Sequence, residues 1–346
     1  MKVNLKLLAQ SLGLSQTTVS RALSGYSDVS PATRQRVREA AQALGYQPDP
    51  TARRLATGRA EAVGLVEPLG TGTLGDPRFV DILGGLADGL AQAHMELLIA
   101  ATRRHTELDV YRRLTSARSV DALVVADARP QDERIRFLQE RGFPFVACGR
   151  SPDAAPHAWF DVDHEAGARI ATERLLELGH RRIALIRACD SSRVAALHLE
   201  GHLDALRAAG LVPDPALQLE SSADAAGGRE TVRRLLAASQ PPTALLVDNA
   251  PAAAGALREL VDRGWQPGQG PSLIVCDDVS EALALPYPVT AVVPPGAAES
   301  GAILARLVLE LLAGLPAQRL QHLAQPVLVP GATDAPLRQP ATAESC

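Results

Sequence analysis

The chain has 346 residues, of which 46% are hydrophobic and 21% charged, as in a globular protein large enough for two or three domains. No apolar run reaches the ~18 residues that a membrane span needs, and the first residues lack the apolar stretch of a secretory signal, so we expect a cytoplasmic protein without membrane contact. The net charge of −4 argues against a nucleic-acid partner, but residues 1–60 have nine basic and three acidic side chains, a charge of +6 that leaves −10 for the rest. A basic module attached to an acidic body is therefore predicted.

Two short helices joined by a turn are predicted near the start of the chain. Asn4 can cap the first, and Gly13 can end it. The apolar residues of this helix recur at the spacing of one helix face, at Leu5, Leu8, Ala9 and Leu12. The second helix is predicted over residues 16–23, and the pair has the spacing of a helix-turn-helix.

The exposed face of the second helix has short polar side chains and one arginine, which suit base edges and phosphates in a DNA major groove. These residues are Gln16, Thr17, Thr18, Ser20 and Arg21. Ser30 and Pro31 are typical of the start of a third helix, and Gly45 of its end. Three such helices also fit a small bundle with a solvated face, so the pattern alone leaves that alternative open.

Residues 49–58 have the pattern of a very short helix. Asp49 can cap it, Pro50 follows at the first helical position, and Gly58 ends it. A helix of one or two turns is not stable alone in water. The segment is either a helix that needs a partner surface or a plain interdomain linker.

From residue 62 onward, short apolar runs alternate with helical stretches, which predicts parallel sheets covered by helices. The first four runs and the later three form two groups, so two doubly wound lobes are predicted. The runs are 62–66, 96–100, 122–126, 145–148, 182–186, 244–247 and 272–276. The helical stretches lie near 78–93, 132–141, 164–178, 194–209, 226–238 and 251–264.

Motifs of catalysis and of cofactor binding fail on inspection. The GTGTLG run (70–75) has the spacing of a dinucleotide loop, but the next apolar run ends in Thr102 rather than an acid. His164 and Glu165 begin a zinc-protease pattern whose second histidine is replaced by Ala168. No CxxC pair occurs among Cys148, Cys189, Cys276 and Cys346. We expect no cofactor, no metal and no enzyme activity.

The run GLSQTTVSRALSGYSDVSPATRQRVREAAQALGYQPDPTARRLATGR (13–59) resembles the N-terminal module of the lactose-repressor/galactose-repressor (LacI/GalR) family. The resemblance implies that Gln16 and Thr17 read bases and that Arg21 bonds a base, commonly guanine. It places Ser15, Thr18, Ser20, Ser30, Thr33 and Tyr46 at phosphate-contacting positions. Asp28 departs from the family pattern, since some relatives place a basic or polar reader there.

The resemblance makes residues 49–60 a hinge helix and linker that order on DNA. Leu55 would be the wedge that two subunits insert into the minor groove, and Ala52 would let the paired helices approach. A homodimer on a pseudo-palindromic operator is therefore expected.

The implied fold is an all-α helix-turn-helix domain (1–48) with this hinge, followed by an α/β core of periplasmic-binding-protein type (61–330). The core would have two doubly wound parallel-sheet lobes, with chain crossings near 159–162, 288–291 and 317–321. The N-lobe would comprise 61–159 and 291–317, and the C-lobe 160–288 and 318–330. The Pro- and Ala-rich residues 331–346 are expected to form a disordered tail.

Position by position, the resemblance also implies an effector cleft between the lobes, at the carboxyl ends of the strands. It would include Arg78, Asp127, Arg150, Asp163, His198, Asn249 and Asp277. His198 stands where relatives have an arginine, and Ala223 where many have a stacking aromatic residue. A sugar or sugar derivative is the family expectation, while Arg78, Arg150 and His198 would also suit an acidic or phosphorylated ligand.

Together these observations predict a transcriptional regulator, a repressor in function, whose operator binding is controlled by a small-molecule effector. A solute-binding transport component would explain the body but leaves the DNA-binding module without a role. An enzyme on two Rossmann-like lobes would need a cofactor site or a catalytic set, and the sequence has neither.

Overall fold

The computed structural model describes residues 4–23, 26, 28–46, 58–68, 77–103, 106–189, 193–279 and 288–337. They divide into an N-terminal unit that runs to Glu61 and a larger unit that holds nearly all of the chain from Ala62 onward. None of the described helices is long and apolar enough to cross a membrane.

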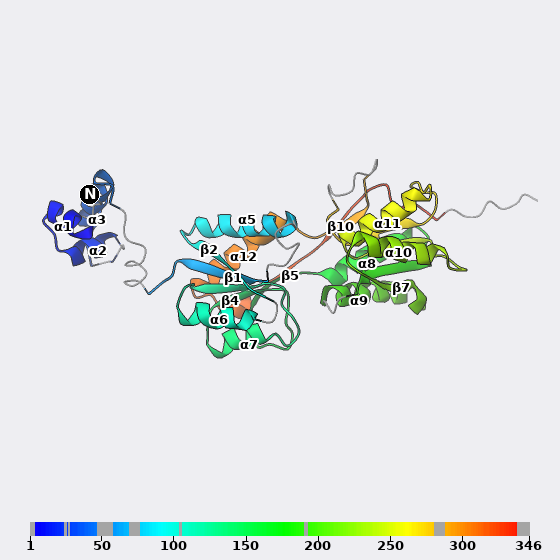
Figure 1. Ribbon diagram of the computed structural model, residues 1–346, viewed down its shortest axis with the longest axis horizontal. Coiled ribbons are helices and arrows are strands. Elements are labelled where there is room, and N and C mark those ends of the chain that lie inside the picture. The colour runs from blue at the N-terminus through cyan, green and yellow to red at the C-terminus, as the bar shows by residue number, and fades with distance from the viewer. Residues whose placement is uncertain are drawn as a thin grey trace, which may run out of the picture. The chain divides into compact units, whose positions relative to one another are not determined.

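The described part of the N-terminal unit folds into short helices (Figure 1). These are α1 (Leu5–Leu12), α2 (Gln16–Leu23) and α3 (Pro31–Ala43), which confirms the three predicted helices. Asn4 caps α1 by accepting a hydrogen bond from the Leu7 N–H at 3.0 Å, and Gly13 ends it at φ 64°. The core of the unit is small and consists of Leu8, Ala9, Val19, Ala22, Val29, Val37 and Ala41.

The first lobe of the larger unit is built on a six-stranded sheet in the order β11-β5-β4-β3-β1-β2, and all its strand pairs are parallel. Its strands are β1 (Ala62–Glu67), β2 (Glu96–Ala101), β3 (Ala122–Val125), β4 (Phe145–Cys148), β5 (Ala158–Val162) and β11 (Gln321–Ala324). Helices lie on both faces, with α5 and α12 on one and α6 and α7 on the other (Figure 1). They are α5 (Pro77–Ala91), α6 (Glu107–Ser116), α7 (Glu133–Glu140) and α12 (Ala297–Leu312).

The second lobe has the sheet order β12-β10-β9-β8-β6-β7, in which only the edge strand β12 pairs antiparallel among the described strands. Its strands are β6 (Ile183–Ala188), β7 (Gln218–Ser221), β8 (Ala244–Val247), β9 (Ser272–Val275), β10 (Ala291–Val293) and β12 (Val327–Val329). Its helices are α8 (His164–Glu177), α9 (Arg193–Ala208), α10 (Ala225–Leu236) and α11 (Ala250–Asp262). Short 3-10 helices precede β7 (Pro215–Leu217) and β11 (Ala317–Arg319). The two doubly wound lobes are thus confirmed, with one antiparallel edge.

Strand residues of the second lobe alternate between two cores, one on each face of the sheet. On β8, Leu245 and Val247 pack with α10 and α11, whereas Ala244 and Leu246 pack with α8. Because both faces are covered, β8 is apolar along its whole length and is fully buried.

The three chain crossings between the lobes lie a few residues later than predicted. Strand β5 (158–162) belongs to the first sheet, so the first crossing follows Val162 rather than Trp159. Strand β10 (291–293) belongs to the second sheet, and β11 (321–324) to the first. The predicted lobe boundaries are therefore wrong by one short strand at each crossing. The sequence indicates each sheet through the longer apolar runs of its other strands, and these three short strands extend the sheets beyond those runs.

The expected disorder of residues 331–346 is wrong for residues 331–337. Thr333 is buried, and its hydroxyl donates to the Leu273 carbonyl (2.7 Å) and accepts from the Thr290 N–H (2.9 Å). Asp334 pairs with Arg174 at 2.8 Å. This segment is fixed because it satisfies polar groups at the edge of the second lobe, which a count of Pro and Ala cannot reveal. Residues 338–346 lie outside the described part of the chain.

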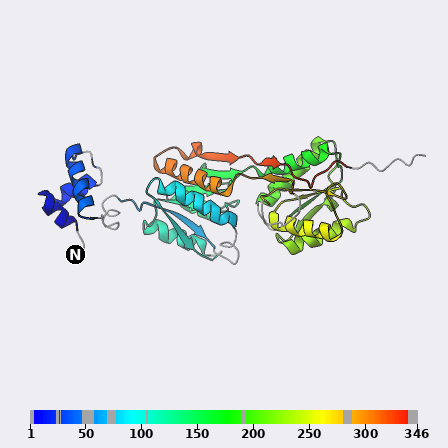
Figure 2. The same cartoon turned by 90° about the horizontal axis from the view of Figure 1, so that it is seen from above.

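Glycines allow paired helices to approach closely in both lobes. Helix α5 lies beside α12 (Figures 1 and 2), and a Cβ added to Gly85 would stand 2.0 Å from the Ala298 carbonyl oxygen. On α9, a Cβ at Gly201 would stand 2.0 Å from the Glu165 carbonyl oxygen of α8. Both glycines therefore serve helix packing within the chain.

Gly201→Ala is expected to destabilise the protein by about 1–3 kcal/mol, because the methyl group collides with a backbone that cannot move without shifting α8. Thermal or denaturant unfolding of the two proteins measures the difference. Glu200→Ala is the control, since this neighbouring residue is exposed on the same helix and its change should stay within about 0.5 kcal/mol. Equal losses in both variants would contradict the close approach of α8 and α9.

His202 makes the free energy of unfolding depend on pH in the mildly acidic range. Burial lowers the pKa of its imidazole from 6.5 to about 4, and its Nδ1 lies 2.9 Å from the Thr172 hydroxyl. Between these two values the unfolded chain binds a proton that the folded chain does not, so stability is full above pH 6.5 and falls as the pH is lowered towards 4.

The free energy of unfolding should therefore fall by up to about 3 kcal/mol over this range through His202 alone. His202→Gln removes the titrating ring, and denaturant unfolding between pH 7 and 4.5 should give a flatter curve for the variant than for the wild type. Parallel curves would assign the acid sensitivity to other groups.

Candidate functional sites

The second helix, α2, presents the polar face that the sequence predicted. Ser15 caps it: the Ser15 hydroxyl accepts from the Thr18 N–H at 3.0 Å and lies 2.8 Å from the Thr18 hydroxyl. Val19 and Ala22 are buried in the core, so the opposite side of the helix is left to solvent. On that side Gln16, Thr17 and Arg21 are exposed and Thr18 and Ser20 are partly exposed.

Two further predicted phosphate-contacting residues, Ser30 and Thr33, lie at the start of α3. Ser30 is exposed, and its hydroxyl caps the helix by accepting from the Thr33 N–H at 3.2 Å. The unsatisfied N–H groups at such a helix end attract anions. Tyr46 is half-buried against the core of the unit and follows Gly45, which adopts φ 62°. Phosphate contacts by these residues stay a prediction.

Arg21, at the end of α2, is held by two residues of the same unit. Its Nη1 lies 2.7 Å from Oδ2 of Asp28, and both side chains are about half exposed. Its guanidinium also lies over the Tyr26 ring, 5.4 Å from the centroid. Asp28, the residue that departs from the family pattern, is therefore the partner of Arg21, the arginine predicted to bond a base. Ala52, Leu55 and the rest of the predicted hinge helix lie outside the described residues.

A cavity of about 190 Å³ in the larger unit brings together four of the seven predicted effector residues. Those four are Arg78, His198, Asn249 and Asp277. The other lining residues are Val162, His164, Gly167, Val194, Asp248, Cys276, Val292, Pro294 and Pro326. The cavity is smaller than the roughly 300–1,000 Å³ of pockets for drug-sized ligands, so it fits a small polar molecule or one unit of a larger one.

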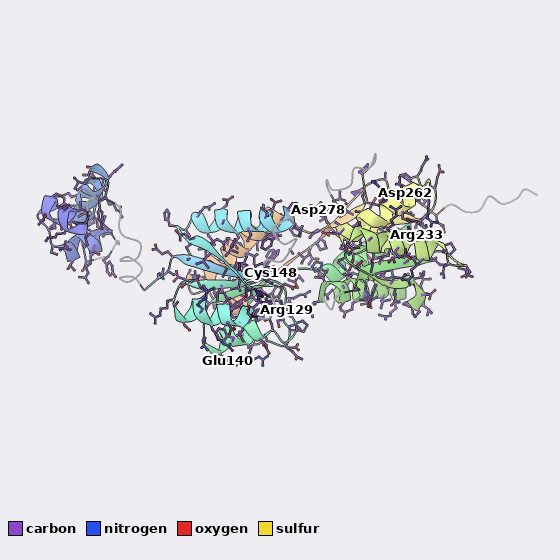
Figure 3. All side chains as sticks on the ribbon, viewed as in Figure 1. Arg129, Glu140, Cys148, Arg233, Asp262 and Asp278 are labelled. Atoms are coloured by element: carbon purple, nitrogen blue, oxygen red, sulfur yellow. The ribbon has the colours of Figure 1, made fainter. Side chains whose placement is uncertain are left out.

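Asn249 and Asp277 follow the neighbouring strands β8 and β9, where their side chains organise the loops. The Asn249 amide oxygen caps α11 by accepting from the Ala252 N–H at 2.9 Å. The Asp277 carboxylate accepts from the N–H groups of Ala250 (2.9 Å) and Asp278 (2.8 Å). Burial raises the pKa of Asp277, and these two hydrogen bonds oppose that shift. Asp278, one of the two residues whose N–H groups donate to Asp277, is labelled in Figure 3.

His198 and His164 form the most unusual part of the cavity. Their rings meet edge to face with centroids 5.2 Å apart. Burial lowers the pKa of His164 to about 3, and His198 and Arg78 add to the shift, so the His164 ring is neutral at pH 7. His198 is buried, and its Nδ1 has no hydrogen-bond partner among the described residues. The nearest Asp248 oxygen is 3.9 Å from this nitrogen, which is too far for a hydrogen bond.

Asp248 also lines the cavity, and it was not among the effector residues predicted from the sequence. Its Oδ2 accepts from the Ala188 N–H at 2.9 Å, and its Oδ1 accepts from the Asn249 amide at 2.6 Å. It directly follows β8, so the rule that ligands bind at the carboxyl ends of parallel strands was the signal that could have found it. His164, at the start of α8, was noted only as part of a failed metal motif.

The other three predicted effector residues do not line this cavity. Arg150 pairs with Asp161 at 2.7 Å. Asp163 caps α8 by accepting from the Ala166 N–H at 3.1 Å. Asp127, after β3, adopts φ 47°, and its carbonyl accepts from a buried arginine, Arg134.

A buried ion-pair cluster lies beside that last residue, at the start of α6 and α7. Arg134 is bonded to Glu107 at 3.0 Å and to Asp132 at 2.7 Å, and all three are buried. Arg129, which Figure 3 labels, is partly exposed, and its Nη2 lies 3.3 Å from Oε1 of Glu107. Every member of this cluster has a charged partner, which indicates a structural role. Within the described residues, no group of His, Cys, Asp and Glu is placed to hold a metal ion.

Comparisons with known proteins agree on both parts of the chain. Residues 4–49 match the family described as "Bacterial regulatory proteins, lacI family". Residues 60–284 match "Periplasmic binding proteins and sugar binding domain of LacI family". The HTH-type transcriptional regulator RafR of Escherichia coli is 38% identical over 332 residues, which cover 96% of this chain and 98% of that protein.

Two solved structures resemble nearly the whole chain. A lac repressor dimer bound to operator and to the anti-inducer ONPF has a TM-score of 0.79 at 25% identity, covering 97% of this chain and 100% of that one. A complex of the transcriptional regulator CelR with cellobiose has a TM-score of 0.71 at 27% identity, covering 96% of this chain and 100% of that one. These relatives are transcriptional regulators rather than enzymes, in agreement with the expectation for this chain. The chain, with its helix-turn-helix unit and its two-lobed α/β core, belongs to the LacI family of bacterial transcriptional regulators.

Proposed function

We propose that the protein is a cytoplasmic repressor that binds a pseudo-palindromic operator as a homodimer and is controlled by a sugar-like effector in the cavity of its core. The observation that carries the proposal is the exposed polar face of α2. This helix belongs to a small basic unit, and the same chain continues into a core with a polar cavity. In this proposal Gln16, Thr17 and Arg21 read bases. The phosphate contacts come from Ser15, Thr18, Ser20, Ser30, Thr33 and Tyr46.

The effector we propose is a neutral polyhydroxyl compound of the sugar class. The cavity has two carboxylates, Asp248 and Asp277, against one guanidinium, Arg78, and the His164 ring is neutral. This balance disfavours the phosphorylated or acidic ligand that Arg78, Arg150 and His198 suggested in the sequence. Carboxylate, amide and imidazole groups suit hydroxyl groups that donate and accept at once. The matched family is described as sugar-binding, and the CelR structure holds cellobiose.

We propose that α5 and the edge strand β2 contribute to the dimer face, with α11 as a second element. Val80 on α5 is 47% exposed, and Ile99 on β2 is 42% exposed. Val261 on α11 is 37% exposed. An edge strand with exposed apolar residues is normally covered in the functional assembly. A dimer on two half-sites also places two copies of α2 on one face of DNA.

Effector control would follow from a population shift. The lobes would have two arrangements, one in which the two hinge segments can pair and one in which they cannot. A ligand that binds better to the second arrangement lowers operator affinity, by at most the ratio of its affinities for the two arrangements. No contact between ligand and DNA is needed.

Arg21→Ala tests the DNA-reading part of the proposal. A duplex selected from a random pool by the full-length wild-type chain is the probe, and its single-base variants are titrated in a mobility-shift assay. The variant should lose about 10–100-fold in discrimination at one base pair, as expected for a lost bidentate contact. Arg38→Ala is the control, because this exposed arginine of α3 is not among the proposed readers, and its effect should be equal for all sequences. Unchanged base discrimination in Arg21→Ala would contradict the placement of α2 in the major groove.

A further inference from the structure

The ion pair between Arg21 and Asp28 joins the last turn of α2 to the segment before α3. The Arg21 Nη1 and the Asp28 Oδ2 are 2.7 Å apart. The guanidinium carbon of Arg21 also lies over the Tyr26 ring, 5.4 Å from the ring centroid. The guanidinium at the end of α2 is thus fixed by two residues of its own unit.

Stability does not explain this pair. Both side chains are about half exposed, and pairs of this kind contribute between nothing and about 1 kcal/mol because water and salt screen them. Asp28 also has a cost for DNA binding: it is one of only three acidic residues among residues 1–60, and it lies beside the helix that we place in the groove. A carboxylate near phosphates weakens the electrostatic attraction on which all DNA binding rests.

We propose that Asp28 is a positioning residue that sets the base preference of Arg21 and restrains the binding of this arginine to phosphates at random sites. The proposal rests on the function proposed above for α2. A guanidinium has five N–H groups in one plane. The ion pair with Asp28 engages one terminal nitrogen of the guanidinium, so the N–H groups of its other nitrogens can reach guanine O6 and N7 as a pair.

Two consequences follow from holding the guanidinium in this way. A preoriented side chain loses less rotamer freedom when it binds the matching base, so the correct contact is favoured over incorrect ones. A guanidinium whose charge is already compensated by a carboxylate gains less from an arbitrary phosphate, so non-specific affinity and its salt dependence are reduced. Asp28 therefore exchanges some total affinity for discrimination between sequences.

Asp28→Asn tests this proposal in the full-length chain, with the duplex selected by the wild type and its single-base variants as probes. Discrimination at the base pair that Arg21→Ala identifies should fall about ten-fold, within the range expected for a contact of this kind. Affinity for an unrelated duplex at low salt should rise about two- to five-fold, with a steeper dependence on salt. Asp28→Ala, which removes the whole polar group, should give at least the same loss of discrimination.

Glu39→Gln is the matched control. It removes one negative charge from an exposed residue of the same unit, whose carboxylate is bonded to Gln35 rather than to Arg21. It should raise affinity for all duplexes equally and leave the base preference unchanged.

The Arg21→Ala/Asp28→Asn double variant separates positioning from direct reading. If Asp28 acts through Arg21, Asp28→Asn should not change discrimination in the Arg21→Ala background. An undiminished effect there would mean that Asp28 contacts a base itself, for instance a cytosine amino group, and would overturn the proposal. Unchanged discrimination in Asp28→Asn would overturn it as well, while loss of discrimination in Arg21→Ala would leave the proposed function of α2 standing. A wild-type chain that selects no duplex would instead remove the proposed function, and this inference with it.

Discussion

Replacing Leu55 by alanine is expected to weaken binding to the selected operator about 100-fold or more, while binding to unrelated DNA at low salt stays nearly unchanged. Leu55 lies outside the described residues, and the expectation comes from its place in the predicted hinge helix, six residues after Asp49. The two losses differ because only the operator complex would need the wedge, whereas weak binding depends on phosphate contacts.

The size of the effect follows from coupled folding. Unstacking a base step costs a few kcal/mol, and the apolar side chains that enter the minor groove offset this cost. A hinge helix of one or two turns has almost no stability of its own, so it forms only if those contacts are made. Alanine keeps the helix propensity but cannot fill the opened step, and a loss of about 3 kcal/mol corresponds to the 100-fold change.

Mobility-shift titrations of both duplexes at several salt concentrations measure the two affinities. Leu315→Ala is the control, because it removes the same side chain from an exposed position (42%) in the larger unit. Its operator affinity should equal that of the wild type. An equal loss on operator and unrelated DNA by Leu55→Ala would indicate a general folding defect and remove the role of Leu55 as a wedge.

The N-terminal unit could be predicted well because its signals are local. Asn4, Gly13 and Ser30 act on the helix next to them, and the structure shows each of them at the helix end where the sequence placed it. The partner of Arg21 could not be predicted in the same way. Asp28 is seven residues away, across a turn, and only the folded path of the chain brings the two charges to 2.7 Å.

The lobes could be predicted as a class, but not their boundaries. Strands of four or more apolar residues, such as β3 and β8, are visible because both faces are buried. The strands at the crossings have only three to five residues, and each gives too short an apolar run to show in the sequence which sheet it joins. Helices α6 and α12 were also missed: α6 has charged residues between its buried positions, and α12 is apolar on most sides because it packs between α5 and the sheet.

The candidate cavity was half predicted, for a related reason. The family resemblance predicted Asn249 and Asp277 as effector residues, and both line the cavity, which lies where polar residues after parallel strands gather at one edge. Asp163 also stands at such a position, but its carboxylate caps α8. A sequence cannot tell whether an aspartate at a helix start serves the helix, a ligand or both, because the same oxygen atoms suit either use.

His198→Leu is expected to raise the dissociation constant of a neutral saccharide effector about 10–100-fold and to leave operator binding without effector unchanged. Asp248 and Asp277 already accept hydrogen bonds from the protein, whereas Nδ1 of His198 is buried and has no partner among the described residues. A buried polar atom without a partner costs about 1–3 kcal/mol, and a ligand hydroxyl would recover that cost. Leucine fills similar space and offers no such bond.

Calorimetric titration of both proteins with a saccharide panel that includes cellobiose measures the change, and sugar acids and sugar phosphates in the same panel test the preference for neutral ligands. His322→Leu is the matched control, because this partly buried histidine stacks on Phe160 and does not line the cavity. It should bind the panel as the wild type does. The described residues offer no partner to Nδ1, so a ligand in the cavity should use this atom. Tight binding of the same saccharide by His198→Leu would therefore show that the effector lies elsewhere in the core. Preferred binding of a sugar phosphate would instead mean that Arg78 outweighs the two carboxylates, and the proposed neutrality of the ligand would be lost.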